Sequence, residues 1–282
     1  MQKAVLVTGA SSGIGLDTVR ALVNHAFFVI ATVRKSEDEI RLNNLFGGKV
    51  KVIKIDLANL TEIEKLPEIL KQDFDITVLH GLVNNAGIAL AAPFQLQDFS
   101  EVQSMIQINL LSLMKVTQVL IPMLKRDSRI INISSVSGKS AMPFLAVYAA
   151  SKHALEGFSE ALRKELMLLE IKVIVVGPGS IKTPIWQKAF EVIKDKYSHT
   201  IFAEPFSRFI KFALNEEKNA LDVNVVSALI IEALTAKNPK FRYAPIPRKF
   251  INWYLPKIIP AIIFNRMTAR ALGLLPNNKK NL

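Results

Sequence analysis

Tyr148 and Lys152 are four residues apart, and on a helix this spacing brings two side chains to one face, about 5–6 Å apart. A phenol with a pKa near 10 is a poor base at neutral pH. A cation about 5 Å away, at an effective dielectric constant of about 20, contributes roughly 3 kcal/mol, or about two pKa units. The spacing therefore predicts a lowered pKa for Tyr148 and proton exchange with a substrate oxygen near neutral pH.

Two further polar residues fit the same chemistry. Ser135 stands thirteen residues before Tyr148, at the end of a predicted strand, where its hydroxyl can hydrogen-bond the same substrate oxygen. Asn109 lies in a predicted helix and is placed to hold a water that passes protons by way of Lys152. A serine hydrolase is disfavoured, because neither Ser134 nor Ser135 has the G-x-S-x-G frame and a partnered histidine. No histidine and carboxylate cluster has metal-ligand spacing, so no metal site is predicted.

A glycine-rich turn, Thr8-Gly9-Ala10-Ser11-Ser12-Gly13-Ile14-Gly15, follows the first apolar run. Glycines let a backbone turn tightly and approach a pyrophosphate, and the helix that follows offers free N–H groups and its positive dipole end. The spacing is G-x-x-x-G-x-G rather than G-x-G-x-x-G, and a tight connection without a ligand is the alternative. As a phosphate cradle, the turn would contact a dinucleotide through Gly9, Ser11, Ser12, Gly13, Ile14 and Gly15.

The end of the second predicted strand indicates which dinucleotide is bound. In NAD-binding folds, an acidic residue about 20 residues after the glycines binds the ribose 2′-hydroxyl. Here no acid occurs before Glu37, and Arg34 stands at the strand end. A guanidinium can grip a 2′-phosphate with two hydrogen bonds, so the sequence favours NADP. The alternative is that Arg34 and Lys35 form an ordinary solvated turn.

Residues after the third and fourth predicted strands complete the expected dinucleotide site. Asp56 is placed to receive the adenine amino group, with Leu57 beside it. Small residues in Asn84-Asn85-Ala86-Gly87 would let the backbone lie against the adenosine ribose. The cofactor contacts expected here are Asp56, Leu57, Asn85, Ala86 and Gly87.

These residues need a scaffold in which strands and helices alternate. Short runs rich in Val and Ile predict strands buried on both faces, at Ala4–Thr8, Phe27–Val33, Val50–Ile55, Thr77–Asn84, Arg129–Ser134 and Lys172–Gly177. Helical patterns lie between them, at Gly13–Asn24, Thr61–Gln72, Phe99–Leu124 and Tyr148–Leu169. This alternation predicts an α/β fold with a doubly wound, Rossmann-type parallel sheet, in which ligands bind at the carboxyl ends of the strands.

With these motifs in order, the chain resembles the short-chain dehydrogenase/reductase family over about residues 3–245. The resemblance is carried by T-G-x-x-x-G-x-G at Thr8–Gly15, N-N-A-G at Asn84–Gly87, Asn109, Ser135, Tyr148-x-x-x-Lys152, and Pro178-Gly179 followed by Thr183. It is closest to the branch of hydroxysteroid and retinol dehydrogenases and acyl-carrier ketoreductases. Ser12 replaces the basic residue that some NADP-binding members place before the second glycine, which leaves phosphate selection mainly to Arg34.

The resemblance implies a role for each matched residue. Tyr148 would be the general acid/base and Ser135 the substrate-orienting donor. Lys152 would bind the nicotinamide ribose and lower the tyrosine pKa, with Asn109 in the proton relay. The loop after the sixth strand would bind the nicotinamide end through Pro178, Gly179, Ile181 and Thr183, the last at the carboxamide. Members of this family commonly form homodimers or homotetramers through the long helices.

The chain divides into a catalytic domain at residues 1–245 and an extension at 246–282. Within the domain, residues 184–215 are rich in aromatic and aliphatic side chains, which fits either core or a helical lid over a large apolar pocket. We therefore expect a sizeable apolar alcohol or ketone as substrate.

The C-terminal extension is both basic and apolar. The net charge is +12, and ten Lys or Arg with no Asp or Glu follow Ala236. One interpretation is a helix packed near the pocket, and the other is an interfacial anchor on an anionic membrane surface. Nucleic acid binding is not predicted, because no recognised motif accompanies the charge.

Cysteine usage and hydropathy bear on the compartment. The chain has no cysteine, which suits a reducing cytoplasm. No signal peptide is expected, and no apolar run reaches the roughly 20 residues needed to cross a bilayer. We expect a cytoplasmic protein, peripheral on the inner membrane surface if the extension is an anchor.

Together these features predict an NADP-dependent oxidoreductase that moves hydride between nicotinamide and an apolar secondary alcohol or ketone, such as a steroid, retinoid or lipid. A 3-oxoacyl-carrier-protein-type ketoreductase, with the basic extension docking an acidic carrier, is the nearest alternative. A non-catalytic NADP-sensing scaffold is a third, but it would have no need for Ser135, Tyr148 and Lys152.

Overall fold

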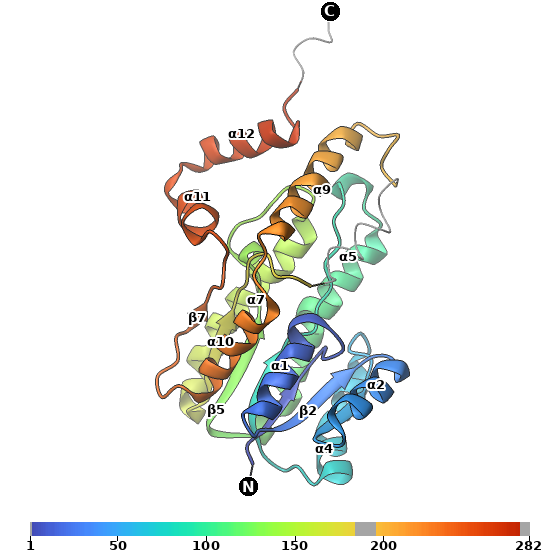
Figure 1. Cartoon of the computed structure of the whole chain (residues 1–282), viewed down its shortest axis with the longest axis vertical. Coiled ribbons are helices and arrows are strands. Elements are labelled where there is room, and N and C mark those ends of the chain that lie inside the picture. The colour runs from blue at the N-terminus through green and yellow to red at the C-terminus, as the bar shows by residue number, and fades with distance from the viewer. Residues whose placement is uncertain (1, 184–195, 277–282) are drawn as a thin grey trace, which may run out of the picture.

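The computed structural model describes residues 2–183 and 196–276, and a seven-stranded sheet lies at its centre (Figure 1). All strand pairs are parallel, in the order β3-β2-β1-β4-β5-β6-β7. The strands are β1 Ala4–Val7, β2 Phe28–Val33, β3 Val50–Lys54, β4 Leu79–Asn84, β5 Leu124–Ile133, β6 Lys172–Val176 and β7 Arg242–Tyr243. The strand order reverses between β1 and β4, which confirms the predicted doubly wound sheet.

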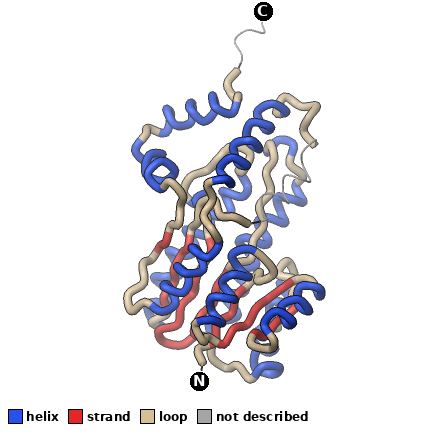
Figure 2. The backbone as a smooth tube through the Cα atoms, viewed as in Figure 1, coloured by secondary structure: helices blue, strands red, loops and turns tan. Residues whose placement is uncertain are grey.

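Helices cover both faces of the sheet, as the ribbon and tube views show (Figures 1 and 2). They are α1 Gly13–Asn24, α2 Ser36–Phe46, α3 Leu60–Glu64, α4 Leu66–Phe74, α5 Phe99–Ile106, α6 Leu113–Leu120, α7 Ala146–Glu165, α9 Ala203–Lys218, α10 Val223–Thr235, α11 Leu255–Ile258 and α12 Ala261–Leu272.

Alternation along each strand decides which helix it packs against. In β1, Val5 and Val7 join the core under α1, α2 and α10, whereas Leu6 joins the core under α3, α4, α6 and α7. Because both faces are covered, β1 is apolar and buried along its whole length.

The structure differs from the sequence prediction in several elements. Helix α2 was not predicted, and Pro67 in the first turn of α4 splits the predicted helix at 61–72 into α3 and α4. The long helix predicted from Phe99 contains a π-helical stretch, Gln107–Ser112, between α5 and α6. Strand β7 was missed because two residues are too short for a periodic signal.

The stretch Phe99–Met123 corrects the expectation that no apolar run is long enough to cross a bilayer. It is 25 residues of continuous helix with a mean hydropathy of 1.3, long and apolar enough by composition to cross a membrane. Only 39% of its most apolar window is buried inside the protein. Met105, Leu113 and Leu120 are buried where α5 packs against α7 and α6 against β4, whereas Phe99 and Leu111 are exposed. Burial of one side of this helix in the fold accounts for part of its apolar character.

A third apolar cluster lies beside α7. It joins Tyr148 and Phe144 with Tyr197, Phe206 and Phe209, and Phe144 makes edge-on contact with the Phe206 ring at 5.2 Å between centroids. The last three residues fall in the segment expected to form a lid. Residues 184–195 of that segment lie outside the described residues.

The extension after residue 246 runs along the same end of the molecule as α9 (Figure 1). Helix α12 contacts α9, and Leu272 at its end is buried in the third apolar cluster. The extension is therefore part of the folded body at this point.

Candidate active site

The glycine-rich turn joins the carboxyl end of β1 to α1. Gly9 and Gly13 have φ angles of +66° and +53°, which side-chain-bearing residues rarely adopt. A Cβ at Gly15 would lie 2.2 Å from the Gly9 carbonyl oxygen and 2.5 Å from Asn85 Nδ2, so only glycine fits. Ser12 is the N-cap of α1 but makes no side-chain capping bond, so backbone N–H groups at this helix start face outward. This is the geometry of a phosphate cradle.

The cradle is fastened to the end of β4 by Asn85 and Thr8. Asn85 Nδ2 donates to the carbonyl oxygens of Thr8 and Gly9, both at 3.0 Å. The Thr8 hydroxyl accepts from the backbone N–H groups of Asn85 and Ala86, at 3.0 and 3.1 Å. A Cβ at Gly9 would lie 2.8 Å from Ala86 Cα, so Gly9 and Ala86 meet backbone to backbone. The structure thus brings together two motifs predicted for the same cofactor.

Two arginines lie near the position expected for the 2′-phosphate. Arg34 is exposed at the end of β2, as predicted. Arg41, on α2, donates from Nη2 to the Ser11 carbonyl oxygen of the glycine-rich turn and to Asp38 Oδ1 at 2.7 Å. Sequence analysis missed Arg41 because α2 itself was not predicted.

Asp56, the acid expected at the adenine, lies two residues after the end of β3 and shapes its own loop. Asp56 Oδ1 accepts from the Ala58 N–H at 2.9 Å, and the Asp56 N–H donates to Glu62 at 2.9 Å. The Leu57 carbonyl oxygen accepts a hydrogen bond from the Ser112 hydroxyl. Asp56 and Leu57 are partly buried, at the same sheet edge as the glycine-rich turn.

The residues after β6 reach back to the glycine-rich turn. A Cβ at Gly13 would lie 3.2 Å from Thr183 Cγ2, so these two predicted contacts are neighbours. Gly179 donates its N–H to the Pro245 carbonyl at 3.0 Å, and Pro178 accepts from the Val136 N–H at 2.7 Å. Ile181 is buried and pairs with Leu221.

Tyr148 and Lys152 lie on one face of α7, as their spacing predicts. Both are buried, and Lys152 Nζ is 6.0 Å from the centre of the Tyr148 ring. Lys152 Nζ donates to the Ile133 carbonyl oxygen at 2.9 Å, which ties α7 to the end of β5. Ser135 follows this strand, is buried, and accepts a hydrogen bond from the Ser137 N–H at 3.1 Å.

The predicted direction of the Tyr148 pKa shift is wrong. Burial raises the pKa of the Tyr148 phenol, and the hydrogen bond with Ser135 only partly opposes this. Burial also lowers the pKa of Lys152 to about 8, against a raising effect of Glu156. The reason is desolvation, which disfavours the charged form of both groups and was left out of the Coulomb argument from spacing.

Asn109 occupies the π-helical stretch and is fully buried. Its Oδ1 accepts from the Ile88 N–H at 2.8 Å, while Nδ2 donates to the Ile88 carbonyl at 2.9 Å and to Ser151 Oγ at 3.1 Å. A Cβ at Gly87 would lie 3.2 Å from Asn109 Oδ1 and 3.7 Å from Lys152 Nζ. Gly87 therefore leaves room where Asn109 and Lys152 converge.

A buried polar network beneath the site was not expected. Asn84 Nδ2 donates to Thr117 Oγ1 and to Asn132 Oδ1, both at 2.9 Å, and Asn132 donates to Ser159 Oγ at 2.8 Å. This network joins β4, β5, α6 and α7. Asn85 follows the end of β4, Ser135 follows the end of β5, and Tyr148 lies on α7. Such contacts between distant segments leave no local sequence signal.

Comparison with known proteins agrees with this geometry. The model of the short chain dehydrogenase family matches residues 3–194. The chain belongs to the short-chain dehydrogenase family of oxidoreductases.

Individual relatives cover nearly the whole chain. The chain is 33% identical to an NADPH-dependent 3-dehydrocapnine reductase of Ornithobacterium rhinotracheale, over 96% of this chain and 97% of the relative. It is 31% identical to a 3-ketodihydrosphingosine reductase of Bacteroides thetaiotaomicron, over 84% and 86%. The fold is similar to that of a short-chain dehydrogenase from Streptomyces avermitilis, with a TM-score of 0.73 at 23% identity, over 96% and 98% of the two chains.

Proposed function

We propose that this protein is an NADP-dependent oxidoreductase that interconverts an apolar ketone and its secondary alcohol. The observation that carries the proposal is the convergence of Ser135, Tyr148 and Lys152 at the carboxyl edge of the sheet, where the glycine-rich cradle also lies. Bound in the cradle, the dinucleotide supplies the hydride.

The protein's own groups manage the proton and the substrate oxygen. Tyr148 donates its phenolic proton to the ketone oxygen during reduction, because its raised pKa keeps the phenol protonated. Ser135 orients that oxygen with its hydroxyl. Lys152 would return a proton from solvent water to Tyr148, and Asn109, held by its two hydrogen bonds to the Ile88 backbone, would position the water of this relay.

Arg34 and Arg41 are the residues that we assign to the 2′-phosphate of NADP. Arg34 is exposed at the end of β2, and Arg41 reaches the turn through the Ser11 carbonyl. No acidic residue occupies the end of β2 itself, where one would bind the hydroxyl of NAD. The relative named as NADPH-dependent supports the same choice.

The third apolar cluster supports an apolar, lipid-like substrate. Phe144, Phe206 and Phe209 pack with the Tyr148 ring in one buried group, so the site's surroundings on that side are aromatic. The two relatives named as reductases of 3-dehydrocapnine and 3-ketodihydrosphingosine favour reduction of a ketone.

Turnover of a panel of ketones, with the aldehyde retinal for comparison, tests the proposal. NADPH oxidation is measured with 3-ketodihydrosphingosine, steroid ketones, retinal and a 3-oxoacyl carrier protein, using the intact protein and Tyr148→Phe. We expect turnover with an apolar ketone and a loss of about 10² or more in the variant, with NADPH still bound. Turnover of the carrier-bound substrate alone would favour the acyl ketoreductase, and NADPH binding without turnover the scaffold. Near-normal turnover by Tyr148→Phe would exclude the mechanism.

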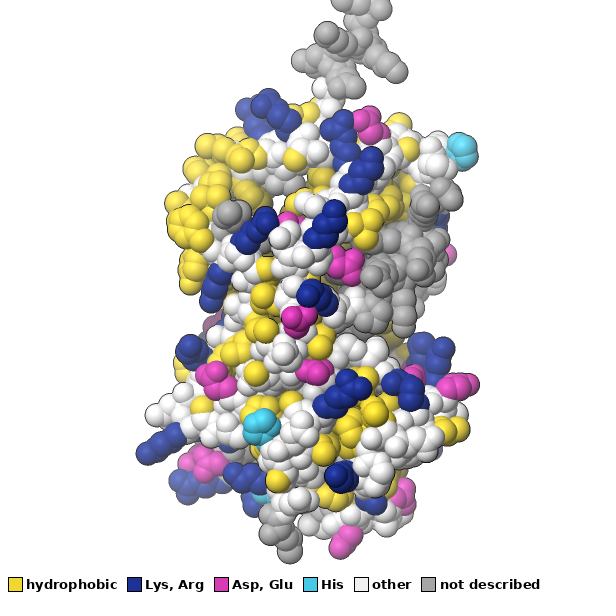
Figure 3. Space-filling model, viewed as in Figure 1, with side chains coloured by type: hydrophobic (Ala, Val, Ile, Leu, Met, Phe, Trp, Pro, Cys, Tyr) yellow, Lys and Arg dark blue, Asp and Glu magenta, His cyan; other side chains and the backbone are white. Residues whose placement is uncertain are grey.

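We also propose that the extension binds an anionic lipid surface. An exposed C-terminal apolar face is formed by Tyr254, Leu255, Ile258, Ile262, Ile263 and Met267. Hydrophobic side chains gather over α11 and α12, with Lys and Arg side chains beside them (Figure 3). The exposed cations on this extension include Lys249, Arg266 and Arg270. Apolar side chains bordered by cations fit the boundary of an anionic bilayer.

A further inference from the structure

Glu156 is a buried carboxylate outside the set of residues that touch a substrate. It lies on α7, one turn beyond Lys152, with only 6% of its side chain exposed. A buried charge is costly unless it is paired and hydrogen-bonded. The protein therefore retains this carboxylate against a considerable desolvation cost.

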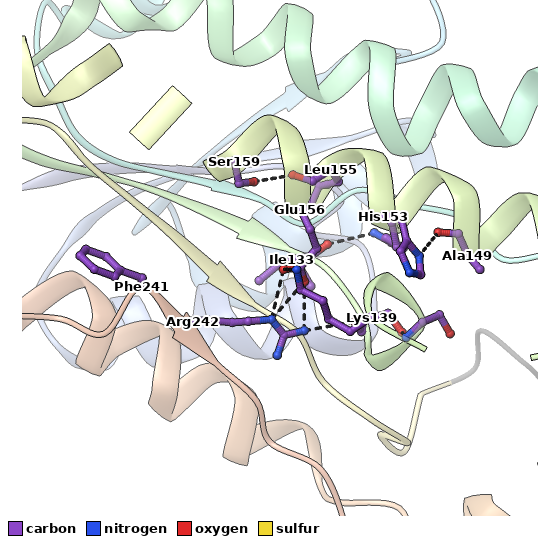
Figure 4. Close-up of polar contacts among 12 residues, drawn as sticks. Ile133, Lys139, Ala149, His153, Leu155, Glu156, Ser159, Phe241 and Arg242 are labelled. Atoms are coloured by element: carbon purple, nitrogen blue, oxygen red, sulfur yellow. Dashed lines mark hydrogen bonds and ion pairs between the residues drawn. The ribbon is translucent and has the colours of Figure 1, made fainter. Parts of the chain in front are cut away.

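Arg242 holds Glu156 with three charged hydrogen bonds (Figure 4). Its Nε donates to both carboxylate oxygens at 3.2 Å, and its Nη2 donates to Oε1 at 3.0 Å. Lys139 Nζ lies 3.5 Å from Oε2. The planar guanidinium fixes the carboxylate's orientation as well as its charge.

We call the hydrogen-bonded pair of Glu156 and Arg242 the clamp. Two glycines leave room for it. A Cβ at Gly177 would lie 2.2 Å from Arg242 Nη2. A Cβ at Gly138 would lie 3.1 Å from Glu156 Cγ and 3.0 Å from the Lys152 carbonyl oxygen. Arg242 Nη2 is also 3.4 Å from the Ser135 carbonyl oxygen, which it meets as a donor. The clamp thus joins β7, the end of β5 and the catalytic helix.

The C-terminal extension covers the clamp. The Trp253 ring lies 4.7 Å from Arg242 Cζ, within the range of a cation–π contact. Arg242 and Trp253 together line a cavity of about 710 Å³ beside α10. Trp253 is therefore placed to hold the guanidinium on its carboxylate.

We propose that Glu156, held by Arg242 under Trp253, is a positioning residue that keeps the Lys152 ammonium protonated and in place. This rests on the proposed role of Lys152. Tyr148, Lys152 and Glu156 recur at four-residue intervals and share a face of α7, so a clamp at Glu156 fixes the rotation of the helix. The charged groups that face Glu156 are cations. Arg242 comes from β7, Lys139 from the loop before α7, and Lys152 and Arg163 from α7 itself.

Direct titration of Lys152 tests the proposal without any need for turnover. Lysine side chains labelled with ¹³C at Cε are followed by NMR in the intact protein, and the Lys152 signal is assigned with Lys152→Arg. Glu156→Gln keeps the shape and removes the charge, so Lys152 should titrate roughly one pH unit lower. Lys139→Gln removes a competing cation, so the midpoint should move upward by a smaller amount. The matched control is Glu160→Gln, an exposed carboxylate on the same helix, which should move nothing.

Glu156→Gln and Lys139→Gln should shift the Lys152 titration midpoint in opposite directions, so each variant tests the proposal separately. An unmoved midpoint in folded Glu156→Gln would overturn the proposal. If that variant does not fold, an unmoved or lowered midpoint in Lys139→Gln would do so. Failure of the proposed function would look different, because Tyr148→Phe would then keep its turnover whatever the Lys152 titration shows.

The contribution of the extension is read from Trp253. Trp253→Leu should lower kcat several-fold and weaken NADPH binding much less than a substitution in the glycine-rich turn, because the loosened clamp acts on Lys152 at the nicotinamide end and leaves that turn unchanged. Trp253→Phe, which keeps a ring over the guanidinium, should restore most of the rate. Equal kcat in the parent protein and in Trp253→Leu would show that Trp253 does not support the clamp.

Discussion

Burial at Lys152 has a consequence for the pH dependence of catalysis. The pKa of Lys152 is lowered to about 8, so the ammonium is present below this pH and is lost as the pH rises through it. The Tyr148 pKa is raised, so the phenol stays protonated over the same range. We predict that kcat/KM for ketone reduction falls with an alkaline limb near pH 8. Thermal unfolding across the same pH range is the control for lost structure, and a flat profile up to pH 10 would show that the Lys152 charge is not needed.

Arg34 should decide the choice of dinucleotide. Hydrogen bonds to charged groups contribute about 1.5–3 kcal/mol, so Arg34→Ala should weaken NADPH binding by about tenfold or more and leave NADH binding little altered. Fluorescence titration with both dinucleotides measures this. Arg126→Ala is a matched control, since Arg126 lies near the start of β5, at the opposite edge of the sheet, and is exposed. If the parent protein binds NADH more tightly than NADPH, the assignment of Arg34 is incorrect.

Two glycines show how position within an element sets the effect of one methyl group. Gly157 lies in α7, and a Cβ there would meet no atom within 4 Å. Gly157→Ala should stabilise the protein by about 0.4–1 kcal/mol, because alanine restricts the unfolded chain and favours the helix. Urea unfolding measures the change in free energy.

Gly15→Ala supplies the contrast in α1. Its Cβ would lie 2.2 Å from the Gly9 carbonyl oxygen, so the turn must open and NADPH binding should be lost or the fold weakened. Equal stability and NADPH affinity in the two variants would show that the turn does not depend on a close backbone approach.

The same elements show what local sequence could and could not predict. Helix α1 has the predicted bounds, and β1 to β6 were found, because buried parallel strands read as short runs of Val and Ile. Helix α2 was missed because its start is acidic and polar, with Leu42 as its one buried side chain. The roles of Ser135, Tyr148 and Lys152 stay predictions until measured, although the fold places all three at one edge.

Contacts between segments that are distant in sequence could not be predicted from local sequence patterns. Glu156 and Arg242 are 86 residues apart in sequence, and no local spacing connects them. Desolvation of Tyr148 likewise depends on packing from several elements, so an argument from helix geometry alone gave the wrong direction for its pKa. The homodimer or homotetramer stays a prediction for the same reason, since it depends on surfaces rather than motifs.

At the scale of the whole molecule, positive charge and exposed apolar surface coincide. Ten of the Lys and Arg residues follow Ala236 without any acidic residue, and the C-terminal apolar face lies on the same extension. Each cation near an anionic surface contributes about 1 kcal/mol, so several together suffice for peripheral binding. We predict that the protein sediments with vesicles containing phosphatidylserine, that binding weakens at high salt, and that a salt-resistant fraction reflects apolar insertion.

Truncation is a poor test of this prediction, because Leu272 is buried in the third apolar cluster and Trp253 covers Arg242. Substitutions on the exposed face avoid the difficulty. Ile262 is 70% and Met267 56% exposed, so Ile262→Gln with Met267→Gln should leave the fold intact and remove the salt-resistant fraction. Arg266→Gln with Arg270→Gln should weaken the dependence on anionic lipid, because about 1 kcal/mol is lost with each cation. The matched control is Leu168→Gln. Leu168 lies in the turn that follows α7, outside the extension, and its side chain is 89% exposed. Equal sedimentation with phosphatidylcholine and phosphatidylserine vesicles, or none with either, would leave the extension as a packed part of the enzyme and its exposed face without a lipid partner.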